Sequence, residues 1–147
     1  MKLGAGLEWL VEYIKMAEKV VPNVRMLQGI NSKVPTEDKM QLAHGEITKW
    51  SEPRKMTYYT MYMYTHYQWI YNHKGWRASI HKYSKMDMLT HLAHEISHIQ
   101  HWEHTTEHKL LEVKLLKMFV QRLRRNGYVS EEAENEQTKK RRCRKIG

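Results

Sequence analysis

Hydrophobic residues recur every three or four positions near the start of the chain, a spacing that predicts an amphipathic helix over residues 7–21. The apolar positions in this run are Leu7, Leu10, Ile14, Ala17 and Val21. Pro22 follows them and cannot continue a helix, so the helix should end there. Residues 29–38 contain Gly, Asn, Ser and Pro, which favour turns, and we expect a loop over this range.

The pattern changes over residues 40–83, where Tyr, Trp, Thr, Ile and Met dominate and favour strands. We predict one strand near residues 41–50, a second within 56–71 and a third near 76–82. Residues 72–75 supply a hairpin turn between the last two, because Gly75 can adopt positive φ. The Tyr- and Met-rich stretch is also compatible with helix, since both residues tolerate either state.

Two further helices are predicted in the second half of the chain. Ser84 and Asp87 form a Ser-x-x-Asp capping pattern ahead of an apolar run, which indicates a helix from there to about Trp102. Thr105 and Thr106 can cap a second helix that ends at residues 126–127. Its apolar positions are Leu111, Leu115, Phe119 and Leu123.

These elements predict an α+β fold: an amino-terminal helix, a small and mostly antiparallel sheet, a second helix that carries the chemistry described below, and a carboxy-terminal packing helix. Residues 1–128 should form one domain, because the chain of 147 residues is long enough for a single hydrophobic core. Residues 129–147 lack apolar periodicity and pass from an acidic to a basic run, which predicts a charged, disordered tail.

Composition excludes several classes of protein. The single cysteine, Cys143, excludes a disulfide framework. No run approaches the roughly 20 apolar residues that a membrane span needs, and Glu8 and Glu12 interrupt any signal-peptide core. We therefore expect a cytoplasmic protein with no membrane partner. Nothing in the sequence predicts an oligomeric state.

Six of the ten histidines lie between His91 and His108, a density that is typical of a metal site. Within this stretch His94, Glu95 and His98 form the pattern H-E-x-x-H. Residues four apart share one face of a helix, so both imidazoles can bind one Zn²⁺ ion at about 2.0–2.1 Å. Glu95 then lies beside the ion without ligating it, which suits a general base acting on a zinc-activated water.

The remaining histidines separate into those on the same helix face and those beyond the helix. At about 100° per residue, His91, His94, His98 and His101 gather opposite an apolar face. The third protein ligand of a catalytic zinc should come from His104, just after the helix, with Glu112 and then His108 as alternatives. Residues 104–108 also spell the inverted pattern H-x-x-E-H, but adjacent threonines make an unbroken helix there unfavourable.

The stretch from His94 to His104 resembles the SprT-like family of small zincin metallopeptidases, which includes Spartan-type DNA-dependent proteases and YgjP-like proteins. The resemblance implies a zincin-like fold, with His94, His98 and His104 as zinc ligands and Glu95 as the general base. It also implies that residues 78–84 form the edge strand that holds an extended peptide by strand addition. The chain departs from the pattern at His108, where many relatives have an aromatic residue. A Gly of the metzincin pattern is replaced by His101, which argues against that family.

We therefore expect a zinc metallopeptidase with one Zn²⁺ ion and a protein or peptide substrate. An additional donor for the developing oxyanion should exist, and the candidates by proximity are His101, His91 and Tyr83. Two other functions remain open. One is a non-enzymatic nucleic-acid-binding protein with a structural zinc, whose fourth ligand would be His101 or His108. The other is a YgjP-like small hydrolase with a non-peptide substrate.

The net charge of +9 suggests where such an enzyme acts. Lys and Arg side chains that neutralise backbone phosphates give affinity for DNA without sequence specificity, so the substrates could be DNA-associated proteins. The candidate contacts are Lys114, Lys117, Arg122, Arg124, Arg125, Lys140, Arg141 and Arg142. A solvated helix face explains the same charges equally well. Trp50, Trp69 and Trp76 could stack on unpaired bases, but we expect core and cross-strand roles for them.

Overall fold

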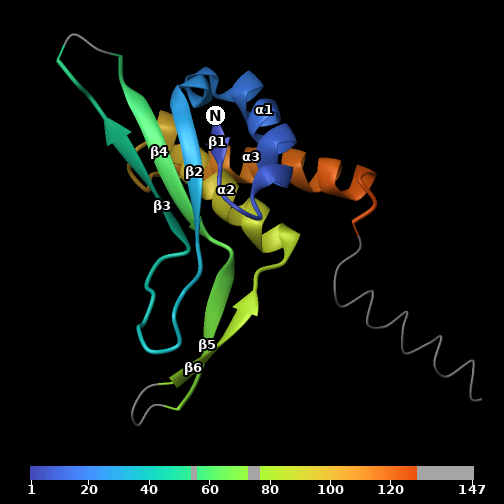
Figure 1. Ribbon diagram of the computed structural model, residues 1–147. Helices are drawn as coiled ribbons and strands as arrows, with labels where there is room; N and C mark the ends of the chain where they lie inside the picture. The colour runs from blue at the N-terminus through green and yellow to red at the C-terminus, as the bar shows by residue number, and fades with distance from the viewer. Residues whose placement is uncertain (54–55, 73–76, 129–147) are drawn as a thin grey trace, which may run out of the picture.

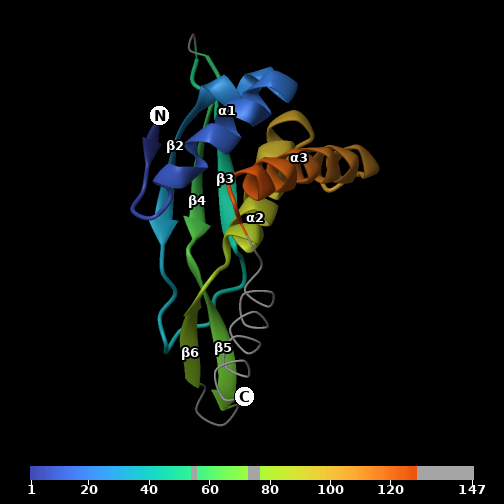
Figure 2. The ribbon, with the colours of Figure 1, turned by 90° about the vertical axis from the view of Figure 1, so that its right-hand side faces the viewer.

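The computed structural model describes residues 1–53, 56–72 and 77–128 as a sheet with helices packed against one of its faces (Figure 1 and Figure 2). The elements are β1 (Lys2–Leu3), α1 (Val11–Val20), β2 (Leu27–Lys33), β3 (Gly45–Trp50), β4 (Tyr58–Tyr64), β5 (His66–Asn72), β6 (Arg77–Lys82), α2 (Lys85–Gln100) and α3 (Thr106–Arg125). Two 3₁₀ turns, Glu8–Leu10 and Pro22–Met26, flank α1. The α+β class is confirmed. The division into a domain and a tail stays a prediction, because residues 129–147 lie outside the described part of the chain.

The sheet is mixed, and the prediction of a mostly antiparallel sheet was wrong for its main part. The four strands lie in the order β1-β2-β4-β3. β2 pairs in parallel with both β1 and β4, and only the β3–β4 pair is antiparallel. The parallel β1–β2 pair is possible because α1 lies between the two strands in the chain and provides the crossover that parallel pairing needs.

β2 occupies much of the range for which a loop was predicted. Gly29, Asn31 and Ser32 are turn-forming residues, but all three pair with β4, and Gly29 also pairs with β1, so this tertiary context outweighs their local preference. Gly29 has a specific role: a Cβ atom there would lie 2.7 Å from the carbonyl oxygen of Lys2, so only glycine allows β1 to approach this closely. The loop after β2 is displaced along the chain and covers residues 34–44 instead of the predicted 29–38.

The predicted helices are confirmed, including their caps. Ser84 precedes α2 and its hydroxyl accepts a hydrogen bond from the backbone N–H of Asp87 at 3.1 Å. Thr105 caps α3 in the same way, through the N–H of His108. The predicted apolar face of the first helix is buried, although its first turn is 3₁₀ rather than α.

The hydrophobic core lies between the sheet and the helices, and it fixes α2 in place. Alternate residues of β4 are buried, as expected for a strand with one face on the core. α2 and α3 pack against each other and contribute the fully buried side chains Leu89, Leu92, Ile96, Leu115 and Phe119. The opposite side of α2 is thereby directed toward β3. None of the helices in the described ranges is long and apolar enough to cross a membrane.

β5 and β6 pair only with each other among the described strands and form an antiparallel ribbon that projects from the body (Figure 1). The strand predicted near 76–82 is confirmed as β6, whereas the range 56–71, which was predicted to hold one strand, holds β4 and most of β5. The turn predicted at residues 72–75 falls largely outside the described residues.

Candidate metal centre

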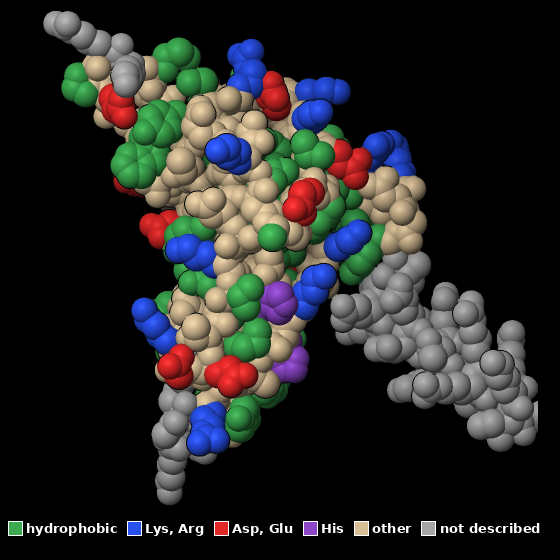
Figure 3. Space-filling model, viewed as in Figure 1, with side chains coloured by type: hydrophobic (Ala, Val, Ile, Leu, Met, Phe, Trp, Pro, Cys, Tyr) green, Lys and Arg blue, Asp and Glu red, His purple; other side chains and the backbone are tan. Residues whose placement is uncertain are grey.

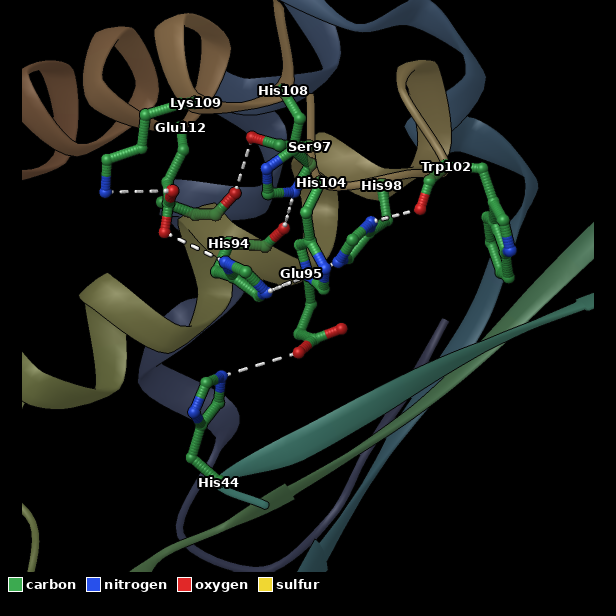
Figure 4. Close-up of polar contacts among 11 residues, drawn as sticks. His44, His94, Glu95, Ser97, His98, Trp102, His104, His108, Lys109 and Glu112 are labelled. Carbon is green, nitrogen blue, oxygen red and sulfur yellow. Dashed lines mark hydrogen bonds and ion pairs between the residues drawn. The ribbon is translucent and has the colours of Figure 1, made fainter. Parts of the chain in front are cut away.

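Three imidazole rings converge where α2 ends and the next loop begins (Figure 4). His94 and His98 lie one helical turn apart on α2, and His104 comes from the loop between α2 and α3. The Nε2 atom of His94 lies 3.3 Å from Nε2 of His98 and 3.2 Å from Nε2 of His104. A tetrahedral zinc ion with Zn–N distances of about 2.0–2.1 Å would hold its ligand atoms about 3.3–3.4 Å apart. The two printed donor pairs, His94–His98 and His94–His104, are therefore spaced as such an ion requires.

The other ring nitrogens of the two α2 histidines have partners that fix their tautomers. Nδ1 of His94 donates to the carboxylate of Glu112 on α3 at 3.0 Å. Nδ1 of His98 donates to the backbone carbonyl of Trp102 at 2.7 Å. When the proton is on Nδ1, the lone pair of Nε2 is free to bind a metal, and such partners are typical of metal-binding histidines. Glu112 therefore lies behind His94, and its position does not support its role as an alternative third ligand.

Glu112 is 8% exposed, and its environment keeps it ionised. Burial alone raises the pKa of a carboxyl group, but the hydrogen bond from His94 and the nearby charges of His94 and Lys109 outweigh burial and lower the pKa of Glu112. Lys109 Nζ lies 3.4 Å from the second carboxylate oxygen. A negative charge is thus fixed on the far side of the His94 ring, which strengthens His94 as a ligand.

His108 is the other histidine that α3 brings to the cluster. Ligand atoms of His94, His98 and His108 lie within 4.8 Å of one another, so this group could also hold a metal ion. However, Nε2 of His108 lies 3.1 Å from the backbone carbonyl of His94, which assigns its proton to that nitrogen. The His108 ring is 2% exposed and packs at 4.2 Å from the His98 ring. The contact with the His94 carbonyl occupies Nε2 of His108, whereas Nε2 of His104 faces Nε2 of His94, so both histidines are candidates for a third ligand and His104 has the free Nε2.

Burial affects the protonation of these rings in the direction that metal binding requires. Desolvation, followed by the charge of His108, lowers the pKa of His98. Desolvation is also the largest cause of the lowered pKa of His108. Neutral imidazole is the form that coordinates a metal, so the lowered pKa of His98 favours the protonation state that a metal ligand needs.

Glu95 is almost completely buried, and its carboxylate faces a histidine that the sequence analysis missed. Nε2 of His44, in the loop before β3, lies 3.4 Å from Oε1 of Glu95, a polar contact that is too poorly aligned to be a hydrogen bond. His44, His94 and Glu95 form a second group whose ligand atoms could hold an ion. His44 is remote from the histidine-rich stretch in the sequence, and no local pattern marks it.

His44 connects the site to two of the predicted oxyanion candidates. His91 stacks on His44 with ring centroids 4.1 Å apart, and Tyr83 meets the edge of His91 at 4.7 Å. Desolvation, and then the charge of His44, lower the pKa of His91 to about 4. Burial raises the pKa of Tyr83. Both side chains therefore lie behind His44. His101 is the C-cap of α2 and does not line the cavity at the site.

A cavity of about 370 Å³ opens between α2 and the start of β3 at this centre. Its lining residues are Leu42, Ala43, His44, Gly45, Glu46, Ile47, His94, Glu95, His98, Trp102 and His104. β3 is at the edge of the four-stranded sheet, so β3, rather than residues 78–84, is the edge strand beside the site. The expected edge strand was wrong because β6 belongs to the separate two-stranded ribbon.

The predicted phosphate-binding residues of α3 are exposed along the helix, away from the metal centre. Arg122 is partly neutralised, because its Nε lies 3.1 Å from a carboxylate oxygen of Glu12. Lys114 and Lys117 lie on the same helix and are exposed, as are Arg124 and Arg125. The candidates Lys140, Arg141 and Arg142 lie outside the described residues.

Comparison of the chain with protein-family models, with curated protein sequences and with solved structures finds no match.

Proposed function

We propose that this chain is a zinc-dependent peptidase of the SprT-like kind that the sequence motif suggests. One observation carries the proposal: three histidine Nε2 atoms converge beside a buried glutamate at the wall of an open cavity. Three neutral imidazoles suit Zn²⁺, and a catalytic site with three protein ligands leaves a position for water or substrate. Zinc bound there would supply Lewis acidity, which lowers the pKa of water toward 7 and polarises a carbonyl group.

Proton transfer and stabilisation of the oxyanion would be carried out by side chains of this chain. Glu95 is 5% exposed, and a carboxylate in such a dry position can accept a proton from the attacking water and return it to the departing amine. Nε2 of His44 lies 3.4 Å from the Glu95 carboxylate, and both side chains line the cavity. His44 lines the cavity beside Glu95, whereas His91, Tyr83 and His101 do not, so His44 joins them as a candidate for the oxyanion donor.

The edge of β3 suggests how a substrate is held. β3 pairs with β4 on one side, and its other edge belongs to the cavity that contains Glu95. An extended peptide that added to this edge would pass in front of Glu95, with backbone hydrogen bonds providing affinity for many sequences. A protein or peptide substrate fits this arrangement. We extend the proposal to DNA-associated proteins on the basis of the net charge of +9.

The decisive experiment compares wild-type protein with Glu95→Gln. Glu103→Gln serves as the control, because it makes the same change at an exposed position in the neighbouring loop. Zinc content is measured by mass spectrometry, and hydrolysis is followed with casein and with DNA-bound protein.

We expect Glu95→Gln to keep one equivalent of zinc. Its rate of hydrolysis should fall by a factor of about 10²–10⁴, which is the usual contribution of general acid–base catalysis. The control should keep both zinc and activity. A protein that binds no zinc contradicts the proposal. Zinc with equal cleavage by Glu95→Gln and wild type leaves a structural zinc, with His108 as a fourth ligand, as the better explanation. Cleavage only of non-peptide substrates would favour the alternative small hydrolase.

A further inference from the structure

The ribbon of β5 and β6 carries an exposed face with no role in the metal centre. Tyr67 pairs with His81, and Trp69 pairs with Ser79, so these residues share one face of the ribbon, which Arg77 extends. We call these five residues the arm face. Trp69 is 65% exposed, an unusual position for a tryptophan, and Tyr67 and His81 stack at 5.5 Å.

The opposite face of the ribbon is covered by the chain itself. The Gln68 side-chain amide donates to the backbone carbonyls of Thr36 and Lys39, at 2.6 and 2.5 Å. Its oxygen accepts from the backbone N–H of Gln41 at 2.9 Å. The loop between β2 and β3 therefore holds the ribbon from one side. On the arm face, Tyr67 is half-buried and meets Tyr83 with ring centroids 5.2 Å apart, whereas Trp69, Arg77 and His81 are exposed.

The described residues of the ribbon include basic side chains and no acidic ones. The chain contains no acidic residue between Glu52 and Asp87. Arg77 lies on the arm face, and Lys82 and Lys85 are exposed where the ribbon joins α2. In Figure 3 acidic side chains lie at the left and near the middle of the lower part of the molecule, and histidines lie along its right edge. A polyanion can therefore approach the arm face without meeting a negative charge on either strand.

The side chains of the arm face select the kind of polyanion. Trp69, Tyr67 and His81 present flat rings rather than aliphatic groups, and Tyr71, next to them, is 61% exposed. Rings spaced along a ribbon stack on unpaired bases, while neighbouring cations follow the phosphates. A duplex buries its bases against each other and offers no such contact. We propose that the arm face binds single-stranded nucleic acid, with bases stacked on Trp69 and Tyr67 and phosphates contacting Arg77.

The binding site is separate from the metal centre and from the basic helix α3, so it does not depend on peptidase activity. The test measures the affinity of the full chain for a fluorescein-labelled oligo(dT), by anisotropy, against a dT/dA duplex of the same length. The variants are Trp69→Ala, Trp69→Phe and Arg77→Gln. Trp50→Ala is the matched control, because Trp50 is also exposed, at 46%, but lies on β3. Lys114→Gln combined with Lys117→Gln tests α3 as the alternative surface.

We expect tighter binding of the single strand than of the duplex, and about a tenfold or greater loss with Trp69→Ala, as for the loss of one stacked base. Trp69→Phe should retain most of the affinity, and Arg77→Gln should reduce the dependence of affinity on salt by about one phosphate contact. Thermal unfolding of each variant verifies that the fold is intact. Trp50→Ala should bind like wild type.

Three results would overturn the proposal. The first is unchanged affinity in both Trp69→Ala and Arg77→Gln, particularly if the α3 variant loses binding instead. The second is the absence of any oligonucleotide binding at low salt. The third is a wild-type dimer in sedimentation that Trp69→Ala converts to a monomer, which would identify the arm face as a contact between two copies of this chain.

Discussion

Replacing Glu112 by glutamine tests the assignment of this residue as the partner of His94 rather than a metal ligand. The substitution keeps the size of the side chain and its ability to accept the Nδ1 proton at the observed 3.0 Å, but it removes the negative charge. A hydrogen bond to a charged group contributes about 1.5–3 kcal/mol. Since about 1.4 kcal/mol corresponds to tenfold in affinity, we expect Glu112→Gln to weaken zinc binding by about 10- to 100-fold.

Competition with a chromophoric chelator measures this change in zinc affinity. Glu103→Gln removes a carboxylate that is exposed rather than buried against His94, and it should leave the affinity within about twofold of wild type because exposed charges are screened. Lys109→Gln provides a graded comparison, since Lys109 contacts the outer oxygen of Glu112 and not the ring.

The absorption spectrum of the Co²⁺-substituted protein distinguishes the two positions of Glu112. If Glu112 contacts only Nδ1 of His94, the visible bands of the saturated Glu112→Gln variant should match those of wild type, because the set of ligand atoms is unchanged. If Glu112 is itself a ligand, the bands should move. Wild-type zinc affinity in Glu112→Gln, or a changed cobalt spectrum, would refute the assignment.

Two further substitutions test His44, which lines the cavity, and His91, which stacks on His44. His44→Ala should keep zinc but lower the rate of peptide hydrolysis by about tenfold or more, because Glu95 loses the group that contacts its carboxylate. The control variant His81→Ala, on the ribbon, should hydrolyse peptides at the wild-type rate. Equal rates in the two variants would contradict a role for His44. For His91, the pKa of about 4 in the folded protein is below the ordinary value of 6.5, so its stabilising contribution is complete above pH 6.5 and is lost as the pH falls toward 4. Urea unfolding of zinc-free protein should therefore show wild type losing about 1–2 kcal/mol more than His91→Phe over that range, after allowance for solvent screening, and parallel stability curves would show that His91 does not titrate in this way.

The helices were predictable because their signals are local. The capping hydroxyl of Ser84 and the apolar residues that follow it lie within one turn or two of each other, and both the cap and the buried face are observed. The parallel pairing of β2 was not predictable from the same kind of signal. Periodicity indicates which side of a strand is buried, but not which strands lie beside it. Gly29 is a turn residue in isolation and a close-packing residue only once β1 lies against it.

Some residues of the candidate metal centre were predictable from local sequence, and others depend on contacts between distant parts of the chain. His94, Glu95 and His98 are identified by their spacing on one helix. His44 contacts Glu95 only because the sheet brings the loop before β3 against α2. The edge strand was placed on β6 because β6 precedes α2 in the chain, whereas the strand beside the cavity is β3. β6 is next to α2 in the sequence, but it belongs to the separate ribbon and does not line the cavity.

Sequence spacing alone does not distinguish His104 from His108 as a candidate ligand. Both histidines follow His98 at sequence separations that allow them to reach the same ion. The difference lies in which ring nitrogen is already occupied. Nε2 of His108 donates to the carbonyl of His94, while Nε2 of His104 faces Nε2 of His94 at 3.2 Å. A motif specifies which residue is present, but a ligand is a single atom with a free lone pair. Nε2 of His108 is already bonded to the His94 backbone, and this difference favours His104 over His108 as the third ligand in the proposed site.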